Sequence, residues 1–314
     1  MTAVEVVPYD AGRRGDYVRL YASVWGERAP SGEVLDWWFD GNPEGGMRSV
    51  AMRDGELVGA AGHSFFRARV GDGERRVAFS LHAVTDTSAR GRGVFSALEL
   101  RHEEMSAGRG AVSALVFPNA ASRPIYAGRL GFETIDRRRV WARPLRGALR
   151  RLRGPRQDPE PAPAPGVRRL ERFDDVTDAV YERQAARLAN HLVRDARHLN
   201  WRYLDAPRPY RALATNGGFA VVGRSERRRA SLAVVLDVVA DPPAVPTLVR
   251  ACVREVGGAC DALLALPTPL LPRSMLARLG FLPTTLRFDL LGKPLAGRLD
   301  ARPWTLSLGD TDFF

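Results

Sequence analysis

The residue types best suited to chemistry lie in the segment 90–93, Arg-Gly-Arg-Gly, which can hold a phosphate group. It separates an apolar, strand-like segment, 77–85, from a helical pattern that covers 98–106 and stops near Gly108. The first turn of a helix has free N–H groups and a partial positive charge. Glycine also removes the side chains that would keep an anion away from the backbone. The segment therefore predicts an anion site whose donors are the amides of residues 92–96.

A second pattern follows along the chain. An apolar strand over 111–117 leads into Pro118-Asn119, and the short helix after it carries Tyr126 and closes in Gly131-Phe132. The first motif is a strand, the sequence Arg-x-x-Gly-x-Gly/Ala and a helix; the second is a strand, an Asn and a helix that carries Tyr. In these two motifs, residues 3–142 resemble the GNAT superfamily of acyl-CoA N-acyltransferases. The resemblance implies an α/β (α+β) fold with a mixed, mostly antiparallel twisted sheet flanked by helices.

One residue departs from the family pattern. Phe95 stands where the second small residue of the first motif, Gly or Ala, is usual. An aromatic ring at this helix position must either turn away from the cofactor pyrophosphate or narrow the cofactor cleft.

The resemblance implies acetyl-CoA as co-substrate and assigns roles to residues. Tyr126 protonates the thiolate leaving group, and a backbone N–H of the preceding strand stabilises the charge that develops on the thioester carbonyl. Asn119 binds the pantetheine arm or, alternatively, caps the following helix with Ser122. The implied cofactor-binding residues are Ala83, Val84, Thr85, Arg90, Gly91, Arg92, Gly93, Val94, Phe95, Ser96, Asn119 and Ser122.

An amine acceptor needs a base, because an alkyl amine with a pKa of about 10 is mostly protonated at neutral pH. His82, on the central strand, is the first choice, and the second predicted catalytic residue beside Tyr126. Asp86, Glu103 or an ordered water are alternatives, and His82 can equally be a core histidine. No His, Cys and Asp cluster has metal-ligand spacing, so no metal is expected.

Composition favours a protein without nucleic-acid or membrane partners. The net charge is +11, but Lys293 is the only lysine, and the arginine bias is typical of a GC-rich genome, as in many bacteria. The charge can still help collect an anionic cofactor. The N-terminal segment shows no signal-peptide pattern and no apolar run reaches bilayer length, so we expect neither a signal peptide nor a membrane span. Cys252 and Cys260 form no disulfide framework and suit a reducing cytoplasm.

The second half of the chain repeats the first. Segment 266–281 aligns without a gap on 117–132, and 201–207 aligns on 37–43. The intervening part is shorter in the second copy and lacks the Arg-x-x-Gly loop; Asp241 stands there and would repel phosphate. The chain is therefore divided into an acetyltransferase domain (1–145), a basic and Pro-rich linker (146–166), a degenerate GNAT-like domain (167–298) and a C-terminal tail (299–314).

The tail is aromatic and acidic, so we expect it to dock on the protein. In the enhanced-intracellular-survival branch of the superfamily a C-terminal carboxylate is the catalytic base, which makes the carboxylate of Phe314 a further hypothesis.

The resulting function is N-acetylation of the primary amine of a small-molecule acceptor. Two alternatives stay open: a non-catalytic acyl-CoA sensor, and a longer-chain or O-acyltransferase on the same fold. Acceptor identity depends on loops around Trp37, Trp38 and Trp201 that carry no recognised signature, and the oligomeric state is not indicated.

Overall fold

The computed structural model describes residues 4–145, 164–227 and 230–312. They form two compact units, each described by itself. The first contains Met1–Asp136 and Asp289–Arg302, and the second contains Arg137–Phe288 and Pro303–Phe314. None of the helices in these described ranges is both long and apolar enough to cross a membrane.

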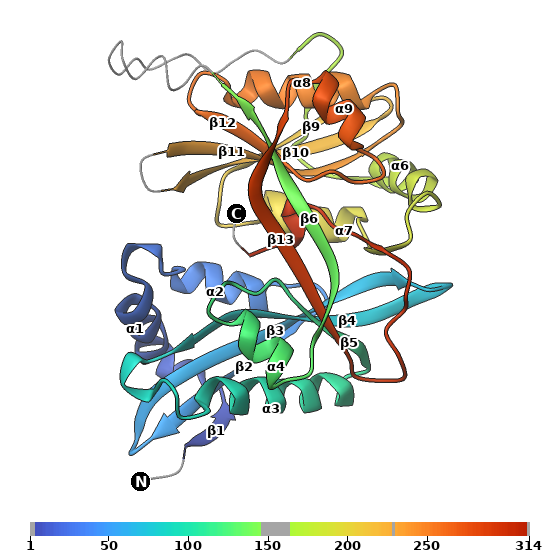
Figure 1. The fold of residues 1–314 in the computed structure, drawn as a ribbon. Helices are drawn as coiled ribbons and strands as arrows, with labels where there is room; N and C mark the ends of the chain where they lie inside the picture. The colour runs from blue at the N-terminus through green and yellow to red at the C-terminus, as the bar shows by residue number, and fades with distance from the viewer. Residues whose placement is uncertain (1–3, 146–163, 228–229, 313–314) are drawn as a thin grey trace. The chain divides into compact units, whose positions relative to one another are not determined.

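The first unit is a mixed sheet with helices on both faces (Figure 1). Its neighbouring strands are antiparallel except for β4 and β5, which are parallel and are connected by α3 (Val94–Gly108). The strand order is β1 (Glu5–Pro8), β2 (Gly46–Arg53), β3 (Glu56–Val70), β4 (Gly73–Thr85), β5 (Ala111–Val116) and the end of β13 (Leu282–Pro294).

Two consecutive residues of β3 show which helices cover which face, because successive side chains of a strand point to opposite faces. Ser64 Oγ donates to the Trp38 carbonyl of α2 (Gly32–Phe39) at 2.6 Å. His63 instead contacts Ser106 of α3. The α2 helix therefore covers one face, together with α1 (Arg14–Trp25), and α3 covers the other, together with α4 (Arg123–Gly128) (Figure 1).

The second unit has its own mixed sheet. Its parallel pair is β11 and β12, connected by α8. The strand order is β7 (Arg168–Arg169), β9 (Tyr210–Thr215), β10 (Gly218–Arg227), β11 (Ala230–Ala240), β12 (Ala262–Ala265) and the end of β6 (Glu133–Pro144). The helices are α6 (Asp175–Ala185), α7 (Ala196–Leu199), a π-helical turn (Asn200–Leu204), α8 (Val245–Val256) and α9 (Arg273–Arg278). A further short strand, β8 (Asn190–Leu192), pairs with β14 (Trp304–Thr305).

The two sheets have the same order of strands, as a duplicated fold requires. In each, a parallel pair joined by a helix follows three antiparallel strands, and a short helix comes after the pair. Each copy also has a β-bulge in the strand before the crossover helix, between Leu81 and Val84 in β4 and between Val235 and Asp237 in β11. The mixed, mostly antiparallel sheets expected from the sequence are confirmed.

The last strand of each sheet is exchanged between the copies. The end of β13 pairs with β5 in the first unit, from Leu291↔Val116 to Pro294↔Ser113. The end of β6 pairs with β12 in the second unit, from Trp141↔Ala265 to Pro144↔Ala262. The compact units therefore differ from the contiguous ranges predicted from the sequence, because β6 and β13 are long enough for their two ends to join different sheets. Most of the predicted linker, 146–163, lies outside the described residues.

The C-terminal segment docks in the second unit, as its composition predicts. Trp304, Leu306 and Leu308 are buried there. Asp310 is also buried and accepts two hydrogen bonds from Arg194 at 2.8 and 2.9 Å, while the same guanidinium donates to Asp237 at 2.8 Å. One buried arginine thus neutralises two buried carboxylates, one of them supplied by the tail.

Arg194→Met is expected to lower the free energy of unfolding by about 3–5 kcal/mol, because it removes the cation that is hydrogen-bonded to both buried carboxylates. The measurement is urea unfolding followed by circular dichroism. Arg101→Met is the control: Arg101 pairs with Glu104 on the surface, so its loss should cost less than about 1 kcal/mol. Equal effects of the two substitutions would contradict the assigned role of Arg194.

Candidate functional site

The predicted phosphate loop has an open surface. Gly91 and Gly93 have φ values of 74° and 80°, a left-handed conformation that glycine adopts readily. A Cβ added at either position meets no atom within 4 Å. Helix α3 begins at Val94, with Gly93 as its N-cap and no side-chain hydrogen bond to cap it. The first-turn N–H groups, which have no partner inside a helix, are therefore directed toward an accessible loop.

The parallel pair β4 and β5 diverges beside this loop. Its register runs from Arg76↔Ala111 to Phe79↔Leu115 and ends there. On its other edge β4 stays paired with β3 as far as Thr85↔Gly59. The edge of β4 after Phe79, which includes Ala83, Val84 and Thr85, thus has no strand partner on the β5 side among the described residues. Backbone groups on this open edge are available to bind a ligand.

Tyr126 lies where the two strands begin to diverge. Its hydroxyl is 2.7 Å from the Oγ of Ser80, the first residue of β4 beyond the paired part. Ser80 donates its own hydrogen to Glu99 Oε1 at 2.9 Å. Since a serine hydroxyl has one hydrogen, Tyr126 must be the donor to Ser80. The tyrosine is 2% exposed, so in this arrangement its proton points toward the interior.

The ring of Phe95 turns toward Tyr126. The two ring centroids are 5.2 Å apart in an edge-to-face arrangement, and Phe132 contacts the other side of Tyr126 at 5.0 Å. Phe95 thus packs into the apolar cluster around α4. The ring therefore packs against α4, and the effect of Phe95 on the cofactor cleft stays a prediction.

His82 lies at the bulge of β4 and has a φ of 51°, unusual for a residue with a side chain. Its imidazole packs edge-on against Trp38 and Phe39, with centroids 6.0 and 6.1 Å away. These rings belong to α2, whereas Ser80 points toward α3. The two predicted catalytic side chains, His82 and Tyr126, are therefore on opposite faces of the sheet, and the role of His82 as a base stays a prediction.

The two alternative bases are engaged elsewhere. Asp86 caps a short 3-10 helix by accepting from the Ser88 N–H at 2.8 Å. The hydrogen bonds from Ser88 lower the pKa of Asp86, which makes it a weaker base. Burial raises the pKa of Glu103, and its Oε2 binds Lys293 of β13.

Asn119 and Ser122 form a local capping turn. Asn119 Oδ1 accepts from the N–H groups of Ala121 and Ser122, each at 2.9 Å. This is the capping arrangement that the sequence leaves open as an alternative to pantetheine binding. Arg90 and Arg92 are exposed on the loop, and the cofactor contacts of all four residues stay predictions.

A buried polar cluster near Tyr126 is not predicted from the sequence. His63, Glu99 and His102 are each 0% exposed, and their ligand-type atoms lie within 4.8 Å of one another. Burial holds the pKa of His102 well below its usual value, so its imidazole is neutral. The available signal is Glu99-x-x-His102, which places both side chains on one helix face. The partner His63 lies on another strand, so the fold is needed to find it.

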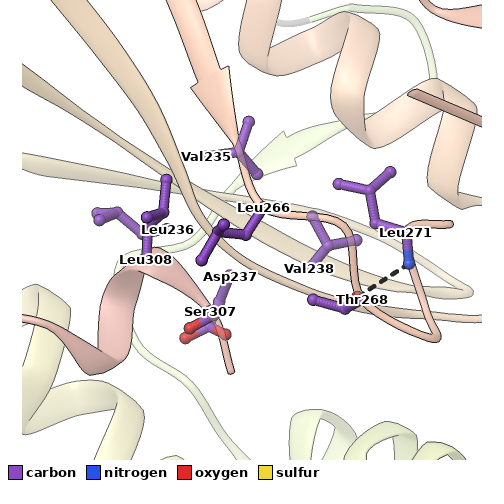
Figure 2. Close-up of a pocket in the computed structure, with 9 residues that line it drawn as sticks. All are labelled: Val235, Leu236, Asp237, Val238, Leu266, Thr268, Leu271, Ser307 and Leu308. Atoms are coloured by element: carbon purple, nitrogen blue, oxygen red, sulfur yellow. Dashed lines mark hydrogen bonds between the residues drawn. The ribbon is translucent and has the colours of Figure 1, made fainter. Parts of the chain in front are cut away.

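The equivalent part of the second unit is closed. Asp241 follows β11 and accepts from Gln184 at 2.6 Å, at the position where the first unit has its Arg-x-x-Gly loop. Beyond the paired part of β11 and β12, Ser307 and Leu308 of the C-terminal segment line part of a small pocket (Figure 2). Thr268, which aligns with Asn119, also forms a local turn, because its Oγ1 accepts from the Leu271 N–H at 3.0 Å. The proposed carboxylate of Phe314 lies outside the described residues.

Residues 7–135 match the family model described as acetyltransferase (GNAT) domain, so the first part of the chain is a GNAT acetyltransferase domain. No curated protein sequence matches the chain at the significance required. The GNAT family implies an acyl-CoA co-substrate, and the match covers both motifs on which the resemblance was based.

Solved structures share the fold of nearly the whole chain. A GCN5-related N-acetyltransferase from Kribbella flavida is 20% identical, with a TM-score of 0.63, over 93% of this chain and 71% of that one. Eis1 from Mycobacterium abscessus is 18% identical, with a TM-score of 0.58, over 93% and 74%. N-myristoyltransferase from Saccharomyces cerevisiae is 11% identical, with a TM-score of 0.65, over 96% and 84%.

A double-mutant cycle tests the hydrogen bond between Tyr126 and Ser80. Ser80→Ala and Tyr126→Phe should each lower the free energy of unfolding, by about 1–3 kcal/mol where a buried partner is left unsatisfied. The double variant should lose less than the sum, with a coupling of about 0.5–3 kcal/mol. Urea unfolding of the four proteins gives the coupling, and additive effects would show that the two hydroxyls do not interact.

Proposed function

Because residues 7–135 form a GNAT acetyltransferase domain, we propose that the protein transfers an acetyl group from acetyl-CoA to a primary amine of a small-molecule acceptor. The observation that carries the proposal is the combination, in one unit, of an open glycine loop at a helix N-terminus with a tyrosine hydroxyl at the point where β4 and β5 diverge. Acetyl-CoA needs both features: the glycine loop for its pyrophosphate and the tyrosine hydroxyl for its sulfur.

The loop supports binding of the cofactor pyrophosphate. The first-turn amides of α3 supply donors, and the positive end of the helix favours an anion. The glycines at 91 and 93 allow the backbone to approach the phosphates closely. Arg90 and Arg92 add two exposed guanidinium groups that can pair with phosphate oxygens.

The open edge of β4 supports binding of the reacting thioester. A backbone N–H of Ala83, Val84 or Thr85 can donate to the carbonyl oxygen as the amine attacks and negative charge develops. When the C–S bond breaks, the thiolate takes the proton of the Tyr126 hydroxyl, and the phenolate regains a proton from solvent before the next turnover. A phenol is suited to this, because its pKa lies only about 1.5 units above that of a thiol. The amine loses a proton to a base, for which His82 is the proposed residue, or to water.

The second unit is proposed to be a GNAT copy without a cofactor site. It keeps the strand order, the bulge and the crossover helix of the first unit. It lacks the glycine loop, carries Asp241 in its place, and has Met275 where the first unit has Tyr126. The protein's own C-terminal segment lines part of the pocket beyond its paired strands.

An acyl-CoA sensor is the second candidate, and one observation favours it. The Tyr126 hydroxyl is buried and donates to Ser80, as a purely structural tyrosine would. A longer-chain or O-acyltransferase would use the same loop and tyrosine, so comparing acyl-CoA thioesters of different length separates that alternative.

The loop is tested with a charge at its second glycine. Gly93→Asp is expected to weaken binding of acetyl-CoA at least about 10-fold, because its carboxylate repels the pyrophosphate and competes for first-turn amides whose bonds to a charged group are worth about 1.5–3 kcal/mol each. Gly93→Ala is the matched control, since it imposes the same positive-φ strain without the charge. Isothermal titration calorimetry gives both affinities. Equal affinities of the Asp and Ala variants would place the cofactor elsewhere.

Tyr126→Phe distinguishes the enzyme from the sensor. A general acid contributes about 10²–10⁴-fold to turnover, so kcat with an amine acceptor should fall by that factor while the affinity for acetyl-CoA changes little. Release of free CoA measures turnover, and calorimetry measures the affinity. Unchanged kcat would remove Tyr126 from the mechanism, and absence of turnover with wild-type protein over a broad amine library would favour the sensor.

A further inference from the structure

The buried face of α3 is unusually polar. Glu99, His102, Glu103 and Ser106 follow one another at helical spacing, and all four are buried. A helix packed on a sheet normally directs apolar side chains to that face. Here the face meets His63, also 0% exposed, on β3.

Three of these side chains bring donor atoms of a metal-binding type together. His63 Nε2 and Glu99 Oε2 are 3.3 Å apart, close to the separation of two ligands on one tetrahedral zinc ion, which follows from metal–ligand bonds of about 2.0–2.1 Å. The His102 ring lies beside His63, with centroids 5.0 Å apart. All three donor atoms fall within 4.8 Å of one another.

His102 supplies the second, independent observation. Both of its ring nitrogens are buried without a hydrogen-bond partner among the described residues, and so is Glu103 Oε1, one residue further along α3. A buried polar group left without a partner costs about 1–3 kcal/mol. A cation bound between His63, Glu99 and His102 would accept a lone pair from one of the two His102 nitrogens and so satisfy that atom.

Two serine hydroxyls orient the cluster residues His63 and Glu99 by hydrogen bonds, as residues around the ligands of a metal site do. Ser106 Oγ is 2.9 Å from His63 Nδ1 and can accept its hydrogen, which leaves Nε2 as the free donor atom. Ser80 donates to Glu99 Oε1, which leaves Oε2 facing His63. Fixing one nitrogen of a histidine and one oxygen of a carboxylate orients the other atom of each toward a metal.

We propose that His63, Glu99 and His102 bind one divalent first-row transition metal ion, with zinc the best match to two imidazoles and a carboxylate. A water would complete the coordination. Because the three ligands are fully buried, the ion is a structural one that is taken up as the first unit folds. The proposal is independent of the acyl-transfer reaction.

The test measures metal content rather than activity. The full-length chain, without an affinity tag, is produced in minimal medium supplemented with zinc or with cobalt and dialysed against a chelator. Elemental mass spectrometry is expected to find close to one metal ion per chain, and the cobalt protein should show the visible absorption of a tetrahedral site. Less than about a tenth of an equivalent in folded wild-type protein would overturn the proposal, because a closed structural site holds its metal tightly.

Variants locate the ion. His102→Gln and Glu99→Gln should each remove the metal, whereas His191→Gln should retain it; His191 is an equally buried histidine of the second unit whose ring nitrogens are both hydrogen-bonded. Ser106→Ala keeps every ligand and should weaken binding about 10–100-fold, which provides a variant if the ligand variants fail to fold. Full occupancy in folded His102→Gln would show that the metal lies elsewhere and overturn the assignment.

Discussion

The candidate site depends on one feature of strand pairing: β4 and β5 are hydrogen-bonded only as far as Phe79 and Leu115 and then diverge. Continued pairing would consume the backbone donors of β4 and close the space at its edge. The divergence instead leaves that edge open beside the helix N-terminus of α3, and the bulge in β4 turns His82 toward α2. The loop, the open edge and the tyrosine are near one another because a single parallel pair ends early.

The same divergence has opposite consequences in the two units. In the first, it is bordered by a glycine loop whose left-handed residues leave an open surface. In the second, the pairing of β11 and β12 also ends early, at Val234↔Leu264, but Ser307 and Leu308 line the pocket beyond it (Figure 2). The tail is held there by the buried pair of Arg194 and Asp310. One backbone framework thus carries the candidate ligand site in one copy and a docking site for the chain's own C-terminal segment in the other.

Local patterns in the sequence were sufficient to predict the strand and the helix on either side of the glycine loop. The apolar segment 77–85 is part of β4, and the helical pattern that stops near Gly108 is α3, although α3 begins at Val94 because Gly93 already adopts the N-cap position. Longer-range features could not be predicted. The orientation of His82 depends on a bulge, the cluster of His63 with α3 depends on which strand the helix covers, and the unit boundaries depend on strand ends that pair far along the chain. None of these leaves a periodic signal.

The exchange of β6 and β13 has a consequence for synthesis of the protein on the ribosome. The first sheet is completed only by residues near 291–294, so most of the second unit is translated before β5 acquires its last partner. Until then β5 is an exposed edge, the kind of surface that pairs with other chains. Its partner is also very distant in sequence, and closing so long a loop slows folding. Folding of the two halves of this chain is therefore coupled. If the gene were divided at the linker, neither part would encode a complete sheet.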